Sequence, residues 1–306
     1  MLDLNKRFLW AVLLVGLWWP LASWADKSLR IVVAFPAGGA MDTMARAVAA
    51  ELANTASGRP VVENRPGADG LIALNHVLTQ GDSASTVLMV GPYFTTAQAN
   101  GKLPADKAAR FQPLLHLGDL DIHLIASRQT ALKNRTDLSR PVDKPWTCAA
   151  TGGQFTTVCG LLAREYPHQV LPVPYKGEAQ ALNDVLGGHV DLMPITGLFA
   201  AQYVAAKAVT LIADLSASPG ASRDQASSLV FGGAIKSFYG FVVSRDMPQS
   251  VVSQLNHDIN RIIKNPALDA SARTLGVRLT GGSPSDLAAV LRENTAVQAR
   301  LLESGR

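Results

Sequence analysis

Residues 29–52, LRIVVAFPAGGAMDTMARAVAAEL, contain in that order the signals of a strand, a glycine corner and a helix. Residues 29–35 form a short apolar run, which is typical of a strand buried on both faces. Pro36-Ala37-Gly38-Gly39 ends that run, and apolar side chains then recur at helical spacing from Met41 to Leu52. A buried strand that leads directly into a helix is the building unit of α/β sheets, so this stretch predicts an α/β fold.

The same alternation continues along the chain. The patterns predict further strands at residues 61–63, 86–91, 112–118, 121–127, 146–150, 170–175, 190–195, 208–213 and 237–244. They predict further helices at residues 71–78, 154–165 and 178–186, a long amphipathic helix after Pro248 and a last helix from about Pro284. Residues 216–228, rich in serine, glycine and alanine, are predicted to form a loop.

A polar stretch, residues 128–144, divides this pattern into two lobes. We expect a mixed, mostly parallel sheet in each lobe. The first lobe would contain residues 26–125, with 240–306 returning to it, and the second would contain residues 126–239. Ligands of open α/β sheets bind beyond the carboxyl ends of the strands, and clefts between lobes are favoured pockets. The loops that follow strands are therefore the candidate binding site.

The N-terminus has the pattern of a secretory signal peptide. Lys6 and Arg7 precede a mostly apolar run at residues 8–19, Pro20 breaks this run, and small residues precede a predicted cleavage site after Ala25. The alternative is an uncleaved anchor, because residues 8–25 are all uncharged and about 18 to 20 residues suffice to span a bilayer. We expect the mature chain, from Asp26 onward, to be a soluble, exported monomer.

Export to an oxidising compartment allows the only two cysteines, Cys148 and Cys159, to form a disulfide. The first would end a strand and the second would lie in the following helix. Two free, buried cysteines are the equal alternative. Their spacing is not that of a zinc site.

Composition and motifs argue against several functional classes. The 306 residues are 48% hydrophobic and carry a net charge of +4, without a run of five basic residues, so we expect no nucleic-acid partner. The sequence has no GxSxG nucleophile elbow and no HExxH zinc motif, and its histidines are scattered. We therefore expect neither an enzyme nor a bound metal or cofactor.

The loop after the first strand contains the first group of candidate ligand-binding residues: Pro36, Ala37, Gly38, Gly39 and Asp42. Paired glycines let the backbone approach a ligand, and the first N–H groups of a helix lack partners within the helix. Together with the helix dipole they favour an anion. Asp42 would stabilise the helix start and orient the loop. Taken alone, an ordinary strand-to-helix turn explains the glycines as well.

Two loops of the second lobe supply the other candidates. Gly152 and Gly153 repeat the arrangement of small residues before a helix, and Thr156 adds a hydroxyl. Tyr175-Lys176-Gly177 follows another strand, and Lys176 offers a positive charge to an anion. A lysine in a loop is more often simply solvated.

Three motifs in fixed order resemble the Bug family, the periplasmic substrate-binding components of tripartite tricarboxylate transporters. They are FPAGGAMD at residues 35–42, ENRPGADG at 63–70 and VPYKGEAQALNDVLGGHVDLM at 173–193. The resemblance covers most of the chain from Leu29 to about Met193 and, more loosely, the C-terminal helices.

The resemblance implies a two-lobed, Venus-flytrap protein of the periplasmic-binding type, similar to type II. It implies that the first loop and the Tyr-Lys-Gly loop hold a small carboxylate, largely through backbone groups and water. Carried over to this sequence, these positions are Pro36, Ala37, Gly38, Gly39, Tyr175, Lys176 and Gly177.

The second-lobe part of the site departs from the family pattern. The motif TGGQFTTVC lacks the histidine that usually begins the next helix, and residues 216–233 lack the usual Pro-Thr and Glu-Ala-Gly elements. Residues 81–86 also replace a usual Asp-Gly-Tyr-Thr stretch. The pocket of this chain is therefore expected to differ from that of its relatives, and the ligand cannot be carried over.

Together with the loops that favour an anion, the resemblance implies a protein that captures a small organic carboxylate, a mono- or dicarboxylate, and delivers it to the permease subunits of a tripartite transporter. The alternative is a receptor that reports its ligand to a membrane sensor kinase, with a periplasmic enzyme as a remote third possibility.

Overall fold

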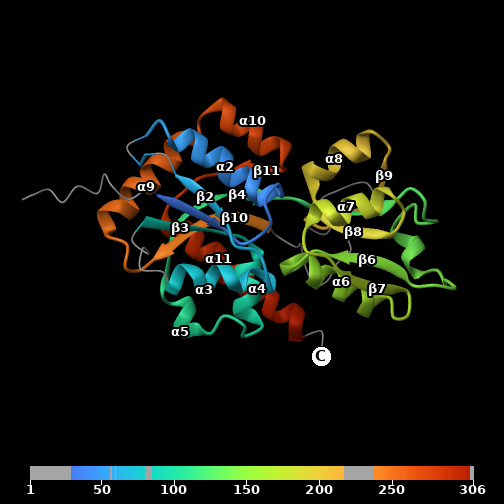
Figure 1. Ribbon diagram of the computed structural model, residues 1–306. Helices are drawn as coiled ribbons and strands as arrows, with labels where there is room; N and C mark the ends of the chain where they lie inside the picture. Colours follow the sequence, from blue (N-terminus) through green and yellow to red (C-terminus); the bar gives the residue numbers. More distant parts are fainter. Residues whose placement is uncertain (1–28, 56, 59, 80–84, 217–236, 304–306) are drawn as a thin grey trace, which may run out of the picture.

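The computed structural model describes residues 29–55, 57–58, 60–79, 85–216 and 237–303, whose strands form two separate sheets (Figure 1). The expected signal peptide and nearly all of the loop expected at residues 216–228 lie outside the described residues, as does most of the divergent stretch at 81–86. Within the described ranges, no helix combines the length and the apolar character needed to cross a bilayer.

The first sheet has six strands in the order β11-β4-β10-β3-β1-β2. Their bounds are β1 Arg30–Val33, β2 Val61–Asn64, β3 Thr86–Val90, β4 Phe111–Leu120, β10 Ser237–Ser244 and β11 Val277–Leu279. Strand β1 pairs in parallel with β2 and β3, whereas β10 runs antiparallel to β3 and β4, and β11 antiparallel to β4. β3 and β10 are buried along their whole length, as central strands covered on both faces should be.

Helices cover both faces of this sheet (Figure 1). On one face lie α2 Ala40–Leu52, α9 Gln249–Ile262 and α10 Pro266–Thr274. The other face carries α3 Leu71–Thr79, α4 Pro92–Ala99 and α11 Pro284–Glu303, with the short α5 Ala105–Ala108 and the 3-10 turn η2 Ala68–Gly70 nearby. The predicted amphipathic helix after Pro248 is confirmed, because Val252, Leu255, Ile259 and Ile262 of α9 are buried.

The second sheet has five strands in the order β7-β6-β8-β5-β9. The strands are β5 Ile122–Ser127, β6 Trp146–Ala150, β7 Val170–Pro174, β8 Leu192–Thr196 and β9 Val209–Asp214. The helices are α6 Gly153–Glu165, α7 Glu178–Leu186 and α8 Gly197–Ala205, and a 3-10 turn, η4, spans Arg135–Ser139.

Alternate side chains of the second sheet enter two different cores, as the two-residue period of a strand requires. In β5, Leu124 packs in the cluster that contains Leu162 of α6, whereas its neighbour Ile125 packs with Val185 of α7 and Ala200 of α8. Helix α6 thus covers one face of the sheet, and α7 and α8 cover the other.

The structure confirms the α/β class with a mixed sheet in each lobe and corrects one detail of it. Parallel pairing joins only two of the five neighbouring strand pairs in the first sheet and two of the four in the second, so the sheets are not mostly parallel. Strands β4 and β10 of the first sheet and β5 of the second run antiparallel to their neighbours. An apolar run reveals a buried strand but not the direction of its partners.

Strand pairing also corrects the placement of one strand. β5 belongs to the second sheet, although the sequence analysis placed residues up to 125 in the first lobe. The chain passes from β4 to β5 through a single residue, Asp121, whose carbonyl oxygen accepts a hydrogen bond from the Gly197 N–H at 2.7 Å. Such a short connection leaves no loop by which the sequence would mark the boundary. The lobe limits themselves remain a prediction.

Cys148 and Cys159 form a disulfide, which decides between the two alternatives left open by the sequence. Both residues are completely buried. The bridge ties strand β6 to helix α6 and encloses the corner at residues 151–155 between them.

Candidate functional site

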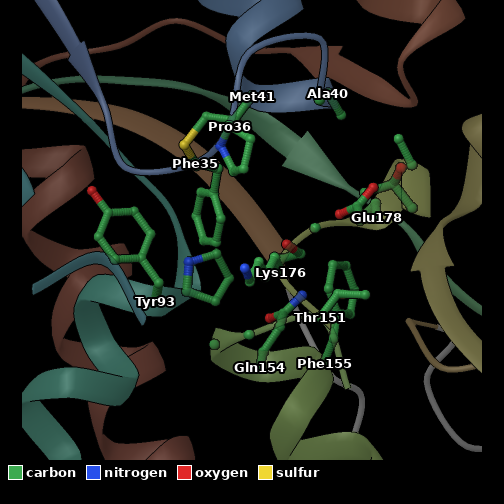
Figure 2. A pocket seen from close by; sticks show the side chains of 18 of the residues that line it. Phe35, Pro36, Ala40, Met41, Tyr93, Thr151, Gln154, Phe155, Lys176 and Glu178 are labelled. Carbon is green, nitrogen blue, oxygen red and sulfur yellow. The ribbon is translucent and has the colours of Figure 1, made fainter. Parts of the chain in front are cut away.

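A cavity of about 290 Å³ lies where the carboxyl ends of strands from both sheets meet (Figure 2). The first lobe contributes aromatic and apolar side chains, and the second contributes most of the polar ones. The lining consists of Phe35, Pro36, Ala37, Gly39, Ala40, Met41, Pro92, Tyr93, Leu120, Thr151, Gly152, Gly153, Gln154, Phe155, Lys176, Gly177, Glu178, Ala179, Gln180, Thr196, Ser237 and Tyr239.

Five helices begin at this cavity. The lining includes the first residues or the N-caps of α2, α4, α6, α7 and α8, each of which directly follows a strand. Four of the five N-cap residues are glycines, and the fifth, Thr196, makes no capping hydrogen bond through its side chain. The N–H groups of a first helical turn lack partners within the helix, and the helix dipole places partial positive charge there. The wall is therefore suited to an anion.

The first corner is held in shape by Asp42, which is 2% exposed. Its Oδ2 accepts hydrogen bonds from the Gly38 N–H at 2.9 Å and the Arg46 Nε at 3.0 Å, and its Oδ1 accepts one from Asn64 at 2.9 Å. Burial alone would raise the pKa of Asp42, but these bonds hold it below its usual value. The N–H of Gly38, a residue with a φ of +82°, is thus hydrogen-bonded within the loop.

The two lobes approach each other through glycines. A Cβ on Gly153, whose φ is +54°, would lie 3.2 Å from the Cβ of Tyr93, and a Cβ on Gly152 would lie 3.6 Å from the ring of Phe35. Phe35 and Tyr93 stack edge to face, with ring centroids 5.5 Å apart. A third approach joins Gly177 to Pro36, at 3.8 Å from a Cβ position. These contacts form the rim between the lobes.

The polar side chains of the cavity lie mainly on its second-lobe wall. Lys176 is exposed and lies in the centre of the view in Figure 2, and Glu178 lies on the opposite side of the cavity from Tyr93. Burial raises the pKa of Glu178 to about 7. Burial also raises the pKa of Tyr93, whose hydroxyl donates to the Met89 carbonyl oxygen at 2.8 Å, so Tyr93 stays protonated.

Seven of the residues singled out in the sequence line the cavity: Pro36, Ala37, Gly39, Gly152, Gly153, Lys176 and Gly177. Four others do not. Gly38 and Asp42 bond to each other inside the first corner, and the Thr156 hydroxyl accepts from the Gly152 N–H at 3.1 Å. The Tyr175 hydroxyl donates a hydrogen bond to Asp184 at 2.6 Å, and Tyr175 is not part of the cavity lining.

Several lining residues were missed by the sequence analysis. Pro92 and Tyr93 follow β3 directly, so the strand-to-helix rule used for the other corners would have found them. Glu178 and Gln154 are the residues next to motifs that were already selected. Ser237 and Tyr239 of β10 carry no local signal, because only the tertiary fold brings this strand to the cavity.

Within the part of the chain that the structure describes, histidine, cysteine, aspartate and glutamate side chains do not form a cluster able to hold a metal ion. The arrangement is that of a binding cleft with donors from helix starts, one lysine and one buried carboxyl group.

Comparison with known proteins places this geometry in context. The family described as "Tripartite tricarboxylate transporter family receptor" matches residues 44–305. The chain is similar to the periplasmic binding protein BugD, with 23% identity, 92% of this chain and 98% of that chain covered, and a TM-score of 0.78. It is also similar to Rpa4515 of R. palustris with adipate, with 22% identity, 92% of this chain and 98% of that chain covered, and a TM-score of 0.79. A third similar structure is MatC of Rhodopseudomonas palustris with bound malate, with 23% identity, 90% of this chain and 99% of that chain covered, and a TM-score of 0.78. At these identities the structures establish a shared fold.

Proposed function

Because the chain belongs to the family of tripartite tricarboxylate transporter receptors, we propose that it captures a small organic carboxylate between its lobes and delivers it to the permease subunits of such a transporter. The family consists of periplasmic binding receptors and not of enzymes, which agrees with the resemblance to the Bug family found in the sequence.

The convergence of five helix starts on one cavity is the observation that carries this proposal. A carboxylate placed there would accept hydrogen bonds from N–H groups that lack partners within their helices, and each dipole near it would add about 0.3–1 kcal/mol. Lys176 supplies a full positive charge at the same wall. Related folds with adipate or malate bound support a carboxylate as the ligand class.

In this proposal the ligand contacts come from Pro36, Ala37, Gly39, Gly152, Gly153, Lys176 and Gly177. Asp42 and Thr156 act one step away, because they hold the loops that supply the backbone groups. No cofactor or nucleic acid takes part, and the receptor acts as a monomer.

A thermal-shift panel of mono-, di- and tricarboxylates tests the proposal, with neutral sugars and alkylamines as controls. A ligand at about 100 times its Kd should stabilise the fold by about 2.7 kcal/mol. At least one carboxylate should stabilise the protein. Stabilisation by the neutral or cationic controls alone would show that the proposed ligand class is wrong.

The export step has its own test. We propose that the signal peptide is cleaved after Ala25 in the periplasm, so the mature chain begins at Asp26. Mass spectrometry of the periplasmic fraction should find this N-terminus. A chain that remains in the membrane fraction with residues 1–25 attached would support the anchor instead.

A further inference from the structure

The second-lobe wall of the cavity holds four buried side-chain oxygens without a hydrogen-bond partner among the described residues: Thr151 Oγ1, Gln154 Oε1, Glu178 Oε2 and Thr196 Oγ1. Thr151, Gln154 and Thr196 are at most 4% exposed. A buried polar atom left without a partner is destabilising, and most buried polar atoms of native proteins have one. Four such atoms on one wall indicate that a ligand or bound water completes them.

Two of these oxygens, Gln154 Oε1 and Oε2 of an ionised Glu178, can only accept hydrogen bonds, so they complement a donor group and not the anion that the helix starts attract. An ionised carboxylate only accepts hydrogen bonds, and a threonine hydroxyl accepts as well as donates. The helix starts, by contrast, present donors. A ligand that fills the cavity therefore meets donors at the helix starts and an acceptor at Glu178, which Figure 2 places across the cavity from Tyr93.

We propose, on the basis of the proposed function, that the ligand is a carboxylate that also carries a hydrogen-bond donor, an ammonium or a hydroxyl group, and that Glu178 selects it. Glu178 is the specificity-determining residue in this scheme. It accepts a hydrogen bond from the donor group and rejects an acid whose second carboxylate would lie against it.

The charges around the cavity favour the same ligand. Burial raises the pKa of Glu178 to about 7, so its carboxyl group is ionised above that pH. Lys176 and the ionised Glu178 then give the wall one charge of each sign, which matches a ligand with one carboxylate and one donor group. Burial raises the pKa of Tyr239, and the nearby Glu178 raises it further, so this residue of β10 stays neutral beside Glu178. A second carboxylate at Glu178 would meet a like charge in a cavity with much apolar lining, which is strongly unfavourable. An ammonium would meet an opposite charge.

The test is isothermal titration calorimetry on the mature protein, at a pH about one unit above the pKa of about 7 of Glu178 so that this group is ionised. Five probes of matched chain length are compared: γ-aminobutyrate, γ-hydroxybutyrate, succinate, butyrate and butylamine, followed by their shorter and longer homologues. Wild-type protein should bind the amino or hydroxy acid at least about tenfold more tightly than the diacid of the same length. Glu178→Gln removes the charge and keeps the shape. The variant should bind the amino acid about tenfold more weakly and the diacid about tenfold more tightly, and its affinity for the hydroxy acid should be nearly unchanged.

Glu165→Gln is the matched control, because Glu165 is an exposed residue at the end of α6 outside the cavity lining. This variant should bind every probe as the wild type does. Two outcomes would overturn the inference and leave the proposed function standing. In one, carboxylates bind but the diacid binds as tightly as the amino or hydroxy acid. In the other, Glu178→Gln changes the ratio of the affinities for the amino acid and the diacid by less than about threefold. Binding of butylamine alone, lost in Glu178→Gln, would overturn the proposed function and keep the acceptor site. Absence of binding by every probe would overturn both.

Discussion

Asp42 shows how a single buried carboxylate sets the shape of a binding loop. Its two oxygens accept hydrogen bonds from Gly38, Arg46 and Asn64. Asp42→Asn removes the charge and one acceptor, and hydrogen bonds to charged groups contribute about 1.5–3 kcal/mol each. We expect this variant to unfold about 1–3 kcal/mol more easily at pH 7 and to bind carboxylates more weakly.

The pH dependence of this difference has a defined sign. The folded-state pKa of Asp42 lies below its unfolded value, so its stabilisation is complete above the unfolded pKa of about 3.9 and is lost as the pH falls through the folded one. Urea unfolding of both proteins between pH 7 and pH 3 should show the stability gap narrowing toward acid. A gap that is constant over this range would mean that the charge of Asp42 contributes nothing.

Gly153 lies at the rim where the two lobes approach each other. Its positive φ is unfavourable for alanine, and an added Cβ would lie 3.2 Å from Tyr93. We therefore expect Gly153→Ala to destabilise the fold by about 1–2 kcal/mol through its backbone conformation. We also expect it to reduce ligand affinity by about tenfold, because the added Cβ would crowd Tyr93 where the lobes meet around the ligand. Gly160→Ala on the same helix is the control, since its Cβ would meet nothing within 4 Å. Equal ligand affinities of the two variants would show that Gly153 is not part of the rim that closes on the ligand.

Individual residues of this site differ in how far the sequence predicts their roles. The corner at Pro36 to Gly39 is predictable, because glycines between an apolar strand and an amphipathic helix have one simple explanation. The hydrogen bond from the Gly38 N–H to Asp42 is not predictable in the same way, because it depends on the conformation of the loop. Glu178 was visible in the Lys176-Gly177-Glu178 loop, but only the packed cavity shows that its carboxyl group is buried.

At the scale of secondary-structure elements, the disulfide joins β6 to α6 around the corner that carries Thr151, Gly152 and Gly153. Bridging residues 11 apart restricts the unfolded chain, and native bridges typically contribute about 2–4 kcal/mol. The double variant Cys148→Ala/Cys159→Ala should lose about this much stability in urea unfolding. Reductant should destabilise the wild type and leave the variant unchanged. A reductant effect of equal size in both proteins would contradict a structural role for the bridge.

Two of the helices that the sequence did not predict, α4 and α8, are poor in polar residues. Residues Pro92 to Ala97 of α4 are all buried, so the helix has no polar face and no helical period in its sequence. Helix α8 is likewise mostly apolar, GLFAAQYVA. Helix α9 was predictable because it has one buried and one solvent-exposed face, which gives its sequence a helical period. A helix that is buried all round cannot be distinguished from a buried strand by periodicity alone.

For the whole molecule, the cavity is shared by two sheets, so a ligand that contacts both walls must favour the arrangement in which they meet. A ligand shifts such an equilibrium only by its difference in affinity for the two states. Small-angle X-ray scattering should therefore show a smaller radius of gyration when the best carboxylate of the panel is added at saturation, with no change for a neutral solute. Gly153→Ala should show less compaction at the same fractional saturation, because its Cβ keeps the rim at Gly153 and Tyr93 apart. If saturating ligand leaves the wild-type scattering unchanged, binding does not depend on lobe closure, and the affinity loss of Gly153→Ala must come from the backbone of the corner itself.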